Sequence, residues 1–224
     1  MKASIIVTAP ASEPVSLPEA KAQLRIDSSD TTYDTELGRI ITEARVWLEN
    51  TYNISLITQT REQRQDNFYD RWPLYSVDSQ WIYNQYSIQL LKPPVQSISS
   101  FTYTAQDGST VTLALTTDYL TAGMMTPVDG QQEILIPRIY PVNTWPAAKL
   151  IPESVKIQYV SGFGTTSAKM PQAIKRALLM LISSLFENRQ DEVLGMGEQL
   201  SKFSMNVEKV MAPFQVYQHV NVNA

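Results

Sequence analysis

The stretch at residues 155–190, VKIQYVSGFGTTSAKMPQAIKRALLMLISSLFENRQ, contains the change of pattern that decides the fold class. Its first six residues place an apolar side chain at every second position, which is the period of a strand with one buried face. Gly162 and Gly164 then interrupt the strand, and Pro171 stands where a first helical turn accepts proline. The remainder has the spacing of an amphipathic helix. The stretch therefore predicts an α+β protein with a helix over 171–190.

The helix predicted at 171–190 is apolar over most of its circumference. One narrow polar stripe interrupts this surface, and it is formed by Gln172, Lys175, Arg176, Ser183 and Glu187. Most of the apolar surface is expected to pack in the core, because so wide an apolar face is buried on several sides. Leu179 falls within the polar stripe, and we therefore expect it to contact a neighbouring subunit.

Two shorter helices are expected upstream of this stretch. Ser16-Leu17-Pro18-Glu19 fits a capping box, in which the serine and glutamate side chains satisfy each other's backbone amides, and predicts a helix over 16–27. A second helix is predicted over 31–53 from apolar residues that recur every three or four positions. Its apolar stripe consists of Leu37, Ile40, Ile41, Ala44, Trp47, Leu48 and Tyr52. The short connection between the two helices predicts a helical hairpin.

The middle of the chain, residues 55–165, is expected to form an antiparallel β layer inserted into the helical body. Asp107-Gly108 lies between two alternating runs, and this dipeptide tolerates the backbone of a tight hairpin. Strands are also predicted at 56–65, 87–91, 133–136 and 155–160. The expected organisation is a single domain over 1–190, with a small helical body and a third, long helix, followed by an extended C-terminal tail over 191–224.

Composition excludes several kinds of chemistry. The chain of 224 residues has no cysteine and one histidine, His219, so we expect no metal site, no cofactor and no enzymatic activity. Its net charge of −4 argues against sequence-specific binding of nucleic acid. It has no apolar run long enough to cross a membrane, and its first ten residues are too short an apolar stretch for a secretory signal. We therefore expect it to be made in the cytoplasm.

Two alternatives stay open at the level of the residues. The loop at 71–86 is rich in aromatic side chains, and they suit either contacts with partner proteins or the platform of a β-rich carbohydrate- or peptide-binding module. The aromatic residues in question are Trp72, Tyr75, Trp81 and Tyr83. Asp66 and Asp70 could form the carboxylate pair of a hydrolase, although ion pairing with neighbouring arginines is the simpler interpretation.

Four segments, in this order and spacing, resemble the head–tail connector, or neck adaptor, family of tailed double-stranded DNA bacteriophages. They are VSLPEAKAQLRID at 15–27, ARVWLE through ITQT at 44–60, LKPPVQSI at 91–98, and the block from Val155 through MPQAIKRA to FENR at 186–189. The resemblance covers about residues 14–190. The loops at 71–86 and 137–152 and the tail exceed what a minimal adaptor needs.

The resemblance implies a structural protein of the virion neck, assembled in the host cytoplasm and without catalytic activity. It implies a ring of about twelve copies beneath the portal, which joins the portal to the next neck or tail protein and lets double-stranded DNA pass without sequence-specific binding. The C-terminal tail is expected to dock on the portal by adding a strand to a sheet edge. The docking residues of the tail are expected to be Met211, Phe214, Val216, Tyr217 and Val220.

Overall fold

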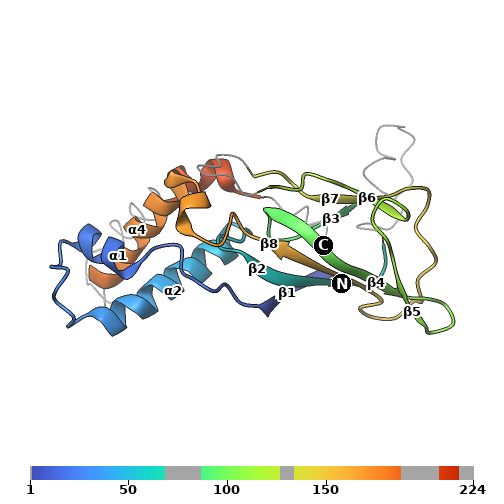
Figure 1. Ribbon diagram of the computed structural model, residues 1–224, viewed down its shortest axis with the longest axis horizontal. Coiled ribbons are helices and arrows are strands. Elements are labelled where there is room, and N and C mark those ends of the chain that lie inside the picture. The colour runs from blue at the N-terminus through green and yellow to red at the C-terminus, as the bar shows by residue number, and fades with distance from the viewer. Residues whose placement is uncertain (1, 69–86, 127–133, 188–206, 217–224) are drawn as a thin grey trace, which may run out of the picture. The chain divides into compact units, whose positions relative to one another are not determined.

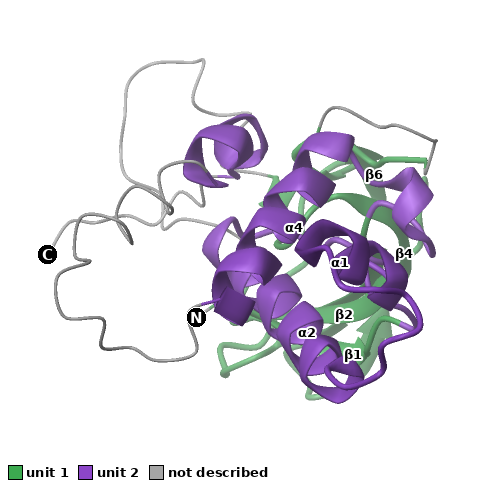
Figure 2. Cartoon of the chain, turned by 90° about the vertical axis from the view of Figure 1, so that its left-hand side faces the viewer, with its two compact units in different colours: residues 1–10, 58–126, 134–162 green, residues 11–57, 127–133, 163–224 purple. Residues whose placement is uncertain are grey.

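The computed structural model of the chain describes residues 2–68, 87–126, 134–187 and 207–216. The chain divides into two units, a strand unit and a helix unit, and each draws on segments that are far apart in the sequence (Figure 2). The strand unit contains residues 2–10 as well as the middle of the chain, and the helix unit contains residues 11–57 and those from 163 onward. The predicted α+β class is confirmed. The predicted boundary between a domain and a tail at residue 190 stays a prediction.

The strand unit holds two antiparallel sheets (Figure 1). The larger sheet has the order β1-β2-β8-β4-β5, and the smaller has the order β3-β7-β6. The strands of the larger sheet are β1 (Lys2–Thr8), β2 (Gln59–Gln65), β8 (Val155–Ser161), β4 (Val95–Thr104) and β5 (Thr110–Thr112). Those of the smaller sheet are β3 (Ile88–Gln89), β6 (Tyr119–Ala122) and β7 (Arg138–Pro141). The β layer thus includes β1, which the sequence pattern did not predict.

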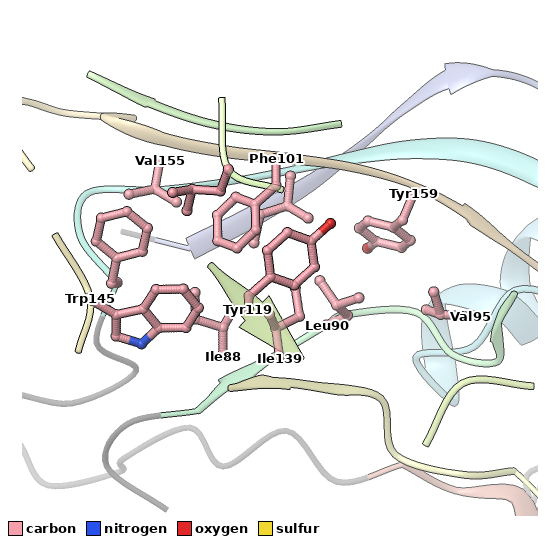
Figure 3. Packing of buried hydrophobic residues seen from close by; sticks show 12 residues of the cluster. Ile88, Leu90, Val95, Phe101, Tyr119, Ile139, Trp145, Val155 and Tyr159 are labelled. Carbon is pink, nitrogen blue, oxygen red and sulfur yellow. The ribbon is translucent and has the colours of Figure 1, made fainter. Parts of the chain in front are cut away.

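The core of the strand unit is a cluster of apolar side chains from both sheets (Figure 3). The alternating residues of β8 point into it, and Val155, Ile157 and Tyr159 are fully buried, as the period of two predicts. Burial raises the pKa of Tyr159 to about 12, and its hydroxyl donates a hydrogen bond of 2.7 Å to the Leu91 carbonyl. Phe68 stacks on Trp145 with ring centroids 5.0 Å apart. This packing removes most of the ring surface of Phe68 and Trp145 from water.

Strand β2 carries polar side chains on its buried face. Gln59, Arg61, Gln63 and Gln65 alternate inward, and each is less than 7% exposed. Gln63 donates to the Gln65 side chain and accepts from the Leu91 amide, while Arg61 donates to the Ser4 hydroxyl. Hydrogen bonding of this kind offsets the cost of removing amides and a guanidinium from water. Periodicity of hydrophobic residues therefore carried little information about this strand.

Two predictions for the strand unit have different outcomes. The hairpin around Asp107-Gly108 is confirmed, because β4 pairs with β5 and Gly108 has a φ of 92°, a conformation that glycine adopts without strain. The strand predicted at 133–136 is wrong over its described part, since residues 134–137 have no regular structure. The strand instead begins at Arg138, where the carbonyl and amide groups pair with β3 and β6.

The helix unit is built from α1 (Leu17–Leu24), α2 (Asp34–Thr51) and α4 (Gln172–Glu187). The predicted helix start at Ser16 is confirmed, because the Glu19 carboxylate accepts a 2.8 Å hydrogen bond from the Ser16 amide. Helix α1 ends at Arg25, whose φ of 60° is left-handed. The α2 side chains Leu37, Ile40, Ile41, Ala44 and Leu48 are buried, as are the α4 side chains Ile174, Ala177, Leu178 and Ile182.

Helices α2 and α4 pack against each other in opposite directions. Just beyond the C-terminus of α2, Ile57 forms a bridge with Gly164, which precedes α4. At the other end, the rings of Tyr33 and Phe186 meet edge to face with centroids 5.4 Å apart. Two contacts at opposite ends fix the antiparallel orientation, and the buried face of each helix is the one that faces the other elements of this unit.

Candidate functional site

A groove lies between α1 and α4, on the side of α4 that carries its polar stripe. It has a volume of about 490 Å³ and is lined by Gln23, Gln172, Lys175, Arg176, Leu179 and Met180. Leu179 is half-buried and stands among the stems of charged and amide side chains. The arrangement suits contact with an apolar side chain flanked by polar groups, and its lining contains no serine, histidine, aspartate or glutamate. The assignment of Leu179 to a subunit contact stays a prediction.

One side of this groove is held by an ion pair between α1 and α4. The Lys175 ammonium lies 2.5 Å from the Glu19 carboxylate, which also accepts hydrogen bonds from the Ser16 amide and hydroxyl. Partial burial of Glu19 opposes its ionisation, but the hydrogen bonds from Lys175 and Ser16 outweigh burial and hold the pKa of Glu19 below its ordinary value. The capping residue of α1 therefore also positions the groove wall on α4.

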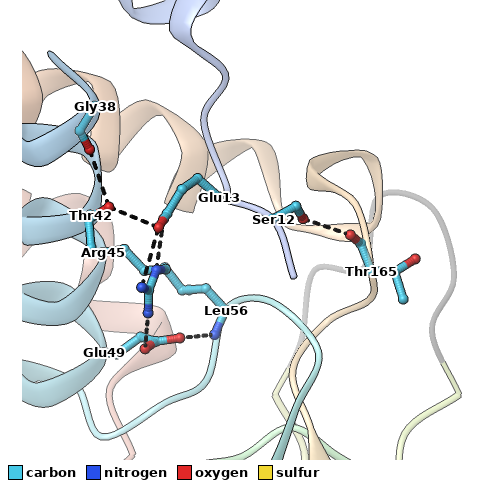
Figure 4. Close-up of polar contacts among 8 residues, drawn as sticks. All are labelled: Ser12, Glu13, Gly38, Thr42, Arg45, Glu49, Leu56 and Thr165. Atoms are coloured by element: carbon cyan, nitrogen blue, oxygen red, sulfur yellow. Dashed lines mark hydrogen bonds and ion pairs between the residues drawn. The ribbon is translucent and has the colours of Figure 1, made fainter. Parts of the chain in front are cut away.

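A second polar network fixes the N-terminal segment and the loop after α2 to that helix (Figure 4). Arg45 donates to Glu13 at 2.8 Å and to Glu49 at 3.2 Å, and Glu49 also accepts the Leu56 amide at 2.8 Å. Burial lowers the pKa of Arg45, but the contacts with the Glu13 and Glu49 carboxylates have the larger combined effect. The pKa of Arg45 is therefore raised. Glu49 is not part of the apolar stripe predicted for this helix, yet this network buries it.

The outward face of α2 carries an apolar patch that the sequence pattern missed. Trp47 is 41% exposed and Val46 is 42% exposed. The prediction that Trp47 belongs to the buried stripe is wrong, because its ring lies at the edge of that stripe and meets Tyr52 edge to face. Counting 100° per residue would have placed Trp47 away from the centre of the buried face. Adjacent exposed apolar side chains on one helix face are typical of a protein contact.

Three predicted docking residues of the C-terminal tail lie within the described residues, and all are buried in the helix unit. Met211 is fully buried, and Phe214 and Val216 are less than 9% exposed. Phe214 closes a 3₁₀ helix over Ala212–Phe214, and the Val216 amide approaches the Tyr52 carbonyl. Phe214 therefore ends a helical turn and Gln215 after it is extended, and docking of the tail by an added strand stays a prediction. A helical turn places Met211 and Phe214 on one buried face.

Other predicted contact residues lie outside the part of the chain that the structure describes. They are Trp72, Tyr75, Trp81 and Tyr83 of the aromatic loop, and Tyr217 and Val220 of the tail. Asp70 also lies outside, whereas Asp66 accepts a hydrogen bond from the Glu153 amide at 3.0 Å. The pairing of Asp66 with Asp70 therefore stays a prediction.

Within 2–68, 87–126, 134–187 and 207–216, no group of three or more histidine, aspartate or glutamate side chains could hold a metal ion. In the same segments, no helix combines the length and the apolar character needed to cross a membrane.

No protein-family model and no curated protein sequence matches this chain. Solved structures do match it over nearly its full length. A chain from the neck of an empty gene transfer agent particle, computed with C6 symmetry, has a TM-score of 0.69 at 16% identity, with 99% of this chain and 100% of that chain covered.

Two further structures show the same similarity. A chain from the virion of a native gene transfer agent particle has a TM-score of 0.66 at 16% identity and covers 97% of each chain. A chain from the neck of a native particle, computed with C12 symmetry, has a TM-score of 0.62 at 17% identity, with 99% of this chain and 100% of that chain covered. The chain thus shares its fold with chains of phage-like particle necks, which confirms the predicted resemblance to neck connectors at the level of the fold.

Proposed function

We propose that this chain is a structural protein of a virion neck, a head–tail connector that forms a ring of about twelve copies beneath the portal. The ring joins the portal to the next neck or tail protein and extends the channel for double-stranded DNA. The observation that carries the proposal is the match of the whole fold, both units included, to a chain from a particle neck at a TM-score of 0.69. Full coverage of both chains means that the similarity is not confined to one common substructure.

The chemistry of the described residues supports a structural role over an enzymatic one. The groove at α1 and α4 offers apolar and polar contact surface, and the polar networks of the helix unit bind its own segments together. The net charge of −4 suits a channel wall that DNA passes without being trapped, since a basic wall would bind the phosphates. The protein would act in the virion neck after assembly in the host cytoplasm.

The C-terminal segment remains our proposed contact with the portal, in two parts. Burial of Met211, Phe214 and Val216 anchors the segment on its own chain. The residues that follow, including Tyr217 and Val220, would then reach the portal and add a strand to a sheet edge there. Deleting 217–224 keeps the anchor and is expected to abolish portal binding, whereas unchanged binding would refute this assignment. Trp72, Tyr75, Trp81 and Tyr83 remain proposed contacts to a subunit or neck partner.

The test of the proposed function is electron microscopy of the full chain mixed with the portal protein of the same particle, with native mass spectrometry of the chain alone as a control. Rings that cap one end of the portal are the expected result. A chain that stays monomeric and leaves the portal bare would refute the connector function. Fluorescence changes of the tryptophans on adding oligosaccharides would then favour a β-rich binding module.

A further inference from the structure

The described C-terminal residues 207–216 form a short strap on the helix unit (red in Figure 1). The strap begins as a helix and continues as a 3₁₀ turn. Val207, Met211 and Phe214 recur at the spacing of one helix face, and each is less than 9% exposed. The strap therefore packs on its own chain in the way that an amphipathic helix docks in a groove of a partner protein.

The strap covers the C-terminal end of α2, where the Val216 amide approaches the Tyr52 carbonyl. Burial raises the pKa of the Tyr52 hydroxyl, and the charge of Glu208 on the strap adds to this effect. The Tyr52 ring is 4% exposed, yet it meets the ring of Trp47, which is 41% exposed. The patch of Val46 and Trp47 is therefore the uncovered rim of an apolar surface that continues beneath the strap.

Seating of the strap leaves one polar group unsatisfied. In the described part of the chain, the Tyr52 hydroxyl oxygen is buried and has no hydrogen-bond partner. A buried hydroxyl in this state has lost its hydrogen bonds to water without gaining any within the protein, and this loss is costly. Phenylalanine at this position would bury the same ring without that cost. The tyrosine thus weakens the seat of the strap.

The forces that hold the strap are close to balance. Burial of its four apolar side chains must offset the conformational entropy lost by ten ordered residues, and these two contributions are of similar size. The Val216 amide adds little, because it lies 3.5 Å from the Tyr52 carbonyl oxygen, beyond the usual range of a hydrogen bond. An unsatisfied hydroxyl shifts such an equilibrium toward release by about 5–150-fold.

We propose that the strap is a releasable cover. It leaves its seat as the residues that follow it dock on the portal, and its release exposes the apolar surface around Tyr52 and Trp47. The trigger rests on the proposed function, whereas the weak seat is a property of the chain alone. A surface that stays covered until the portal is present does not attract other proteins beforehand.

Hydrogen exchange of the full chain alone tests the weak seat. Tyr52→Phe removes the hydroxyl, and we expect the amides of 207–216 to exchange about 5–150-fold more slowly than in the wild type. Tyr33→Phe is the matched control, because Tyr33 lies at the other end of the helix pair, against Phe186, and should leave exchange of the strap unchanged. Strap amides that exchange at the wild-type rate in Tyr52→Phe would overturn the proposal, as would equal slowing in both variants.

Ring formation on the portal protein, followed over time by electron microscopy, tests the release. Because the strap must leave its seat first, Tyr52→Phe should slow ring formation by the same factor as it slows exchange. Met211→Ala removes part of the buried face and should speed both. Rings that form at the wild-type rate in Tyr52→Phe would overturn the release and leave the connector function standing. If the wild-type chain forms no rings, the connector function and the trigger fail together, and exchange in Tyr52→Phe decides the weak seat.

Discussion

Replacement of Arg45 by methionine tests how the helix unit is held together. The Arg45 side chain is 9% exposed and links Glu13, from the segment before α1, to Glu49 on α2. Methionine keeps much of the volume but removes the guanidinium from the Glu49 side chain, which is 6% exposed. Removing one partner of a buried ion pair costs about 3–5 kcal/mol. Since Glu13 is 32% exposed and can regain water, we expect the lower end of that range.

The structure also predicts the order of effects among variants. Glu49→Gln keeps an oxygen that can accept the Leu56 amide, and Arg45 keeps Glu13, so we expect a cost of about 1 kcal/mol. Arg39→Met on the exposed face of the same helix is the matched control. It should change the free energy of unfolding by no more than about 0.5 kcal/mol.

The assay is urea denaturation of the full chain, followed by far-ultraviolet circular dichroism, which reports mainly on the helices. A loss of about 3 kcal/mol corresponds to a fall of about 6–12 °C in the melting temperature of a chain of this size. An Arg45→Met variant as stable as Arg39→Met would refute the reasoning. So would a Glu49→Gln variant that loses more stability than Arg45→Met, because Arg45 is the residue that serves two carboxylates.

Four further predictions concern the core, a turn, the helix cap and the groove. Phe101→Ala removes a ring that is 1% exposed and 5.1 Å from that of Tyr119, and should cost about 4 kcal/mol in denaturant titrations. Gly123→Ala should lower the melting temperature, since Gly123 has a φ of 68° and an added Cβ would lie 2.3 Å from the Ile136 carbonyl oxygen. Partial burial of Glu19 opposes its ionisation, but the hydrogen bonds from Lys175 and Ser16 outweigh burial and hold the pKa of Glu19 below its ordinary value of 4.5. The ionised Glu19 therefore stabilises the fold at a pH above 4.5, and this stabilisation is lost as the pH falls through the lower pKa of the folded state. A Glu19→Gln variant should therefore lose less stability on acidification than the wild type, and equal losses would contradict the ion pair. Leu179→Glu should weaken ring assembly but leave the helical circular dichroism of the monomer intact; an unfolded monomer would mean that Leu179 belongs to the core.

Elements with one clearly apolar face could be predicted from the sequence. The helices α2 and α4, strand β8 and the β4–β5 hairpin were all expected, because burial of one face imposes a period that is visible in the residues. The start of α1 was predictable for a different reason. Its capping box is a local interaction over four residues and needs no tertiary contact.

Strand β1 could not be predicted in this way, whereas the strand predicted at 56–65 is confirmed as β2 over Gln59–Gln65. Strand β1 is an edge strand whose Ile5, Ile6 and Val7 are all more than 40% exposed, so its apolar residues follow one another and do not alternate. Strand β2 buries glutamine and arginine, whose hydrogen bonds come from Ser4, Leu91 and other distant residues. Only the tertiary partners explain why β1 is a strand and why β2 buries polar side chains.

The sequence by itself determined where α1 begins and which segments with one apolar face form helices and strands, and it rules out thiol chemistry because it contains no cysteine. Tertiary structure decided which face of each element is covered. It buried Glu49, which looks exposed in the helical pattern, and left Trp47, which looks buried, 41% exposed. The physical reason is that periodicity is a property of one segment, whereas burial depends on what packs against it. The exposure of Val46 and Trp47 on α2 therefore became visible only in the packed structure.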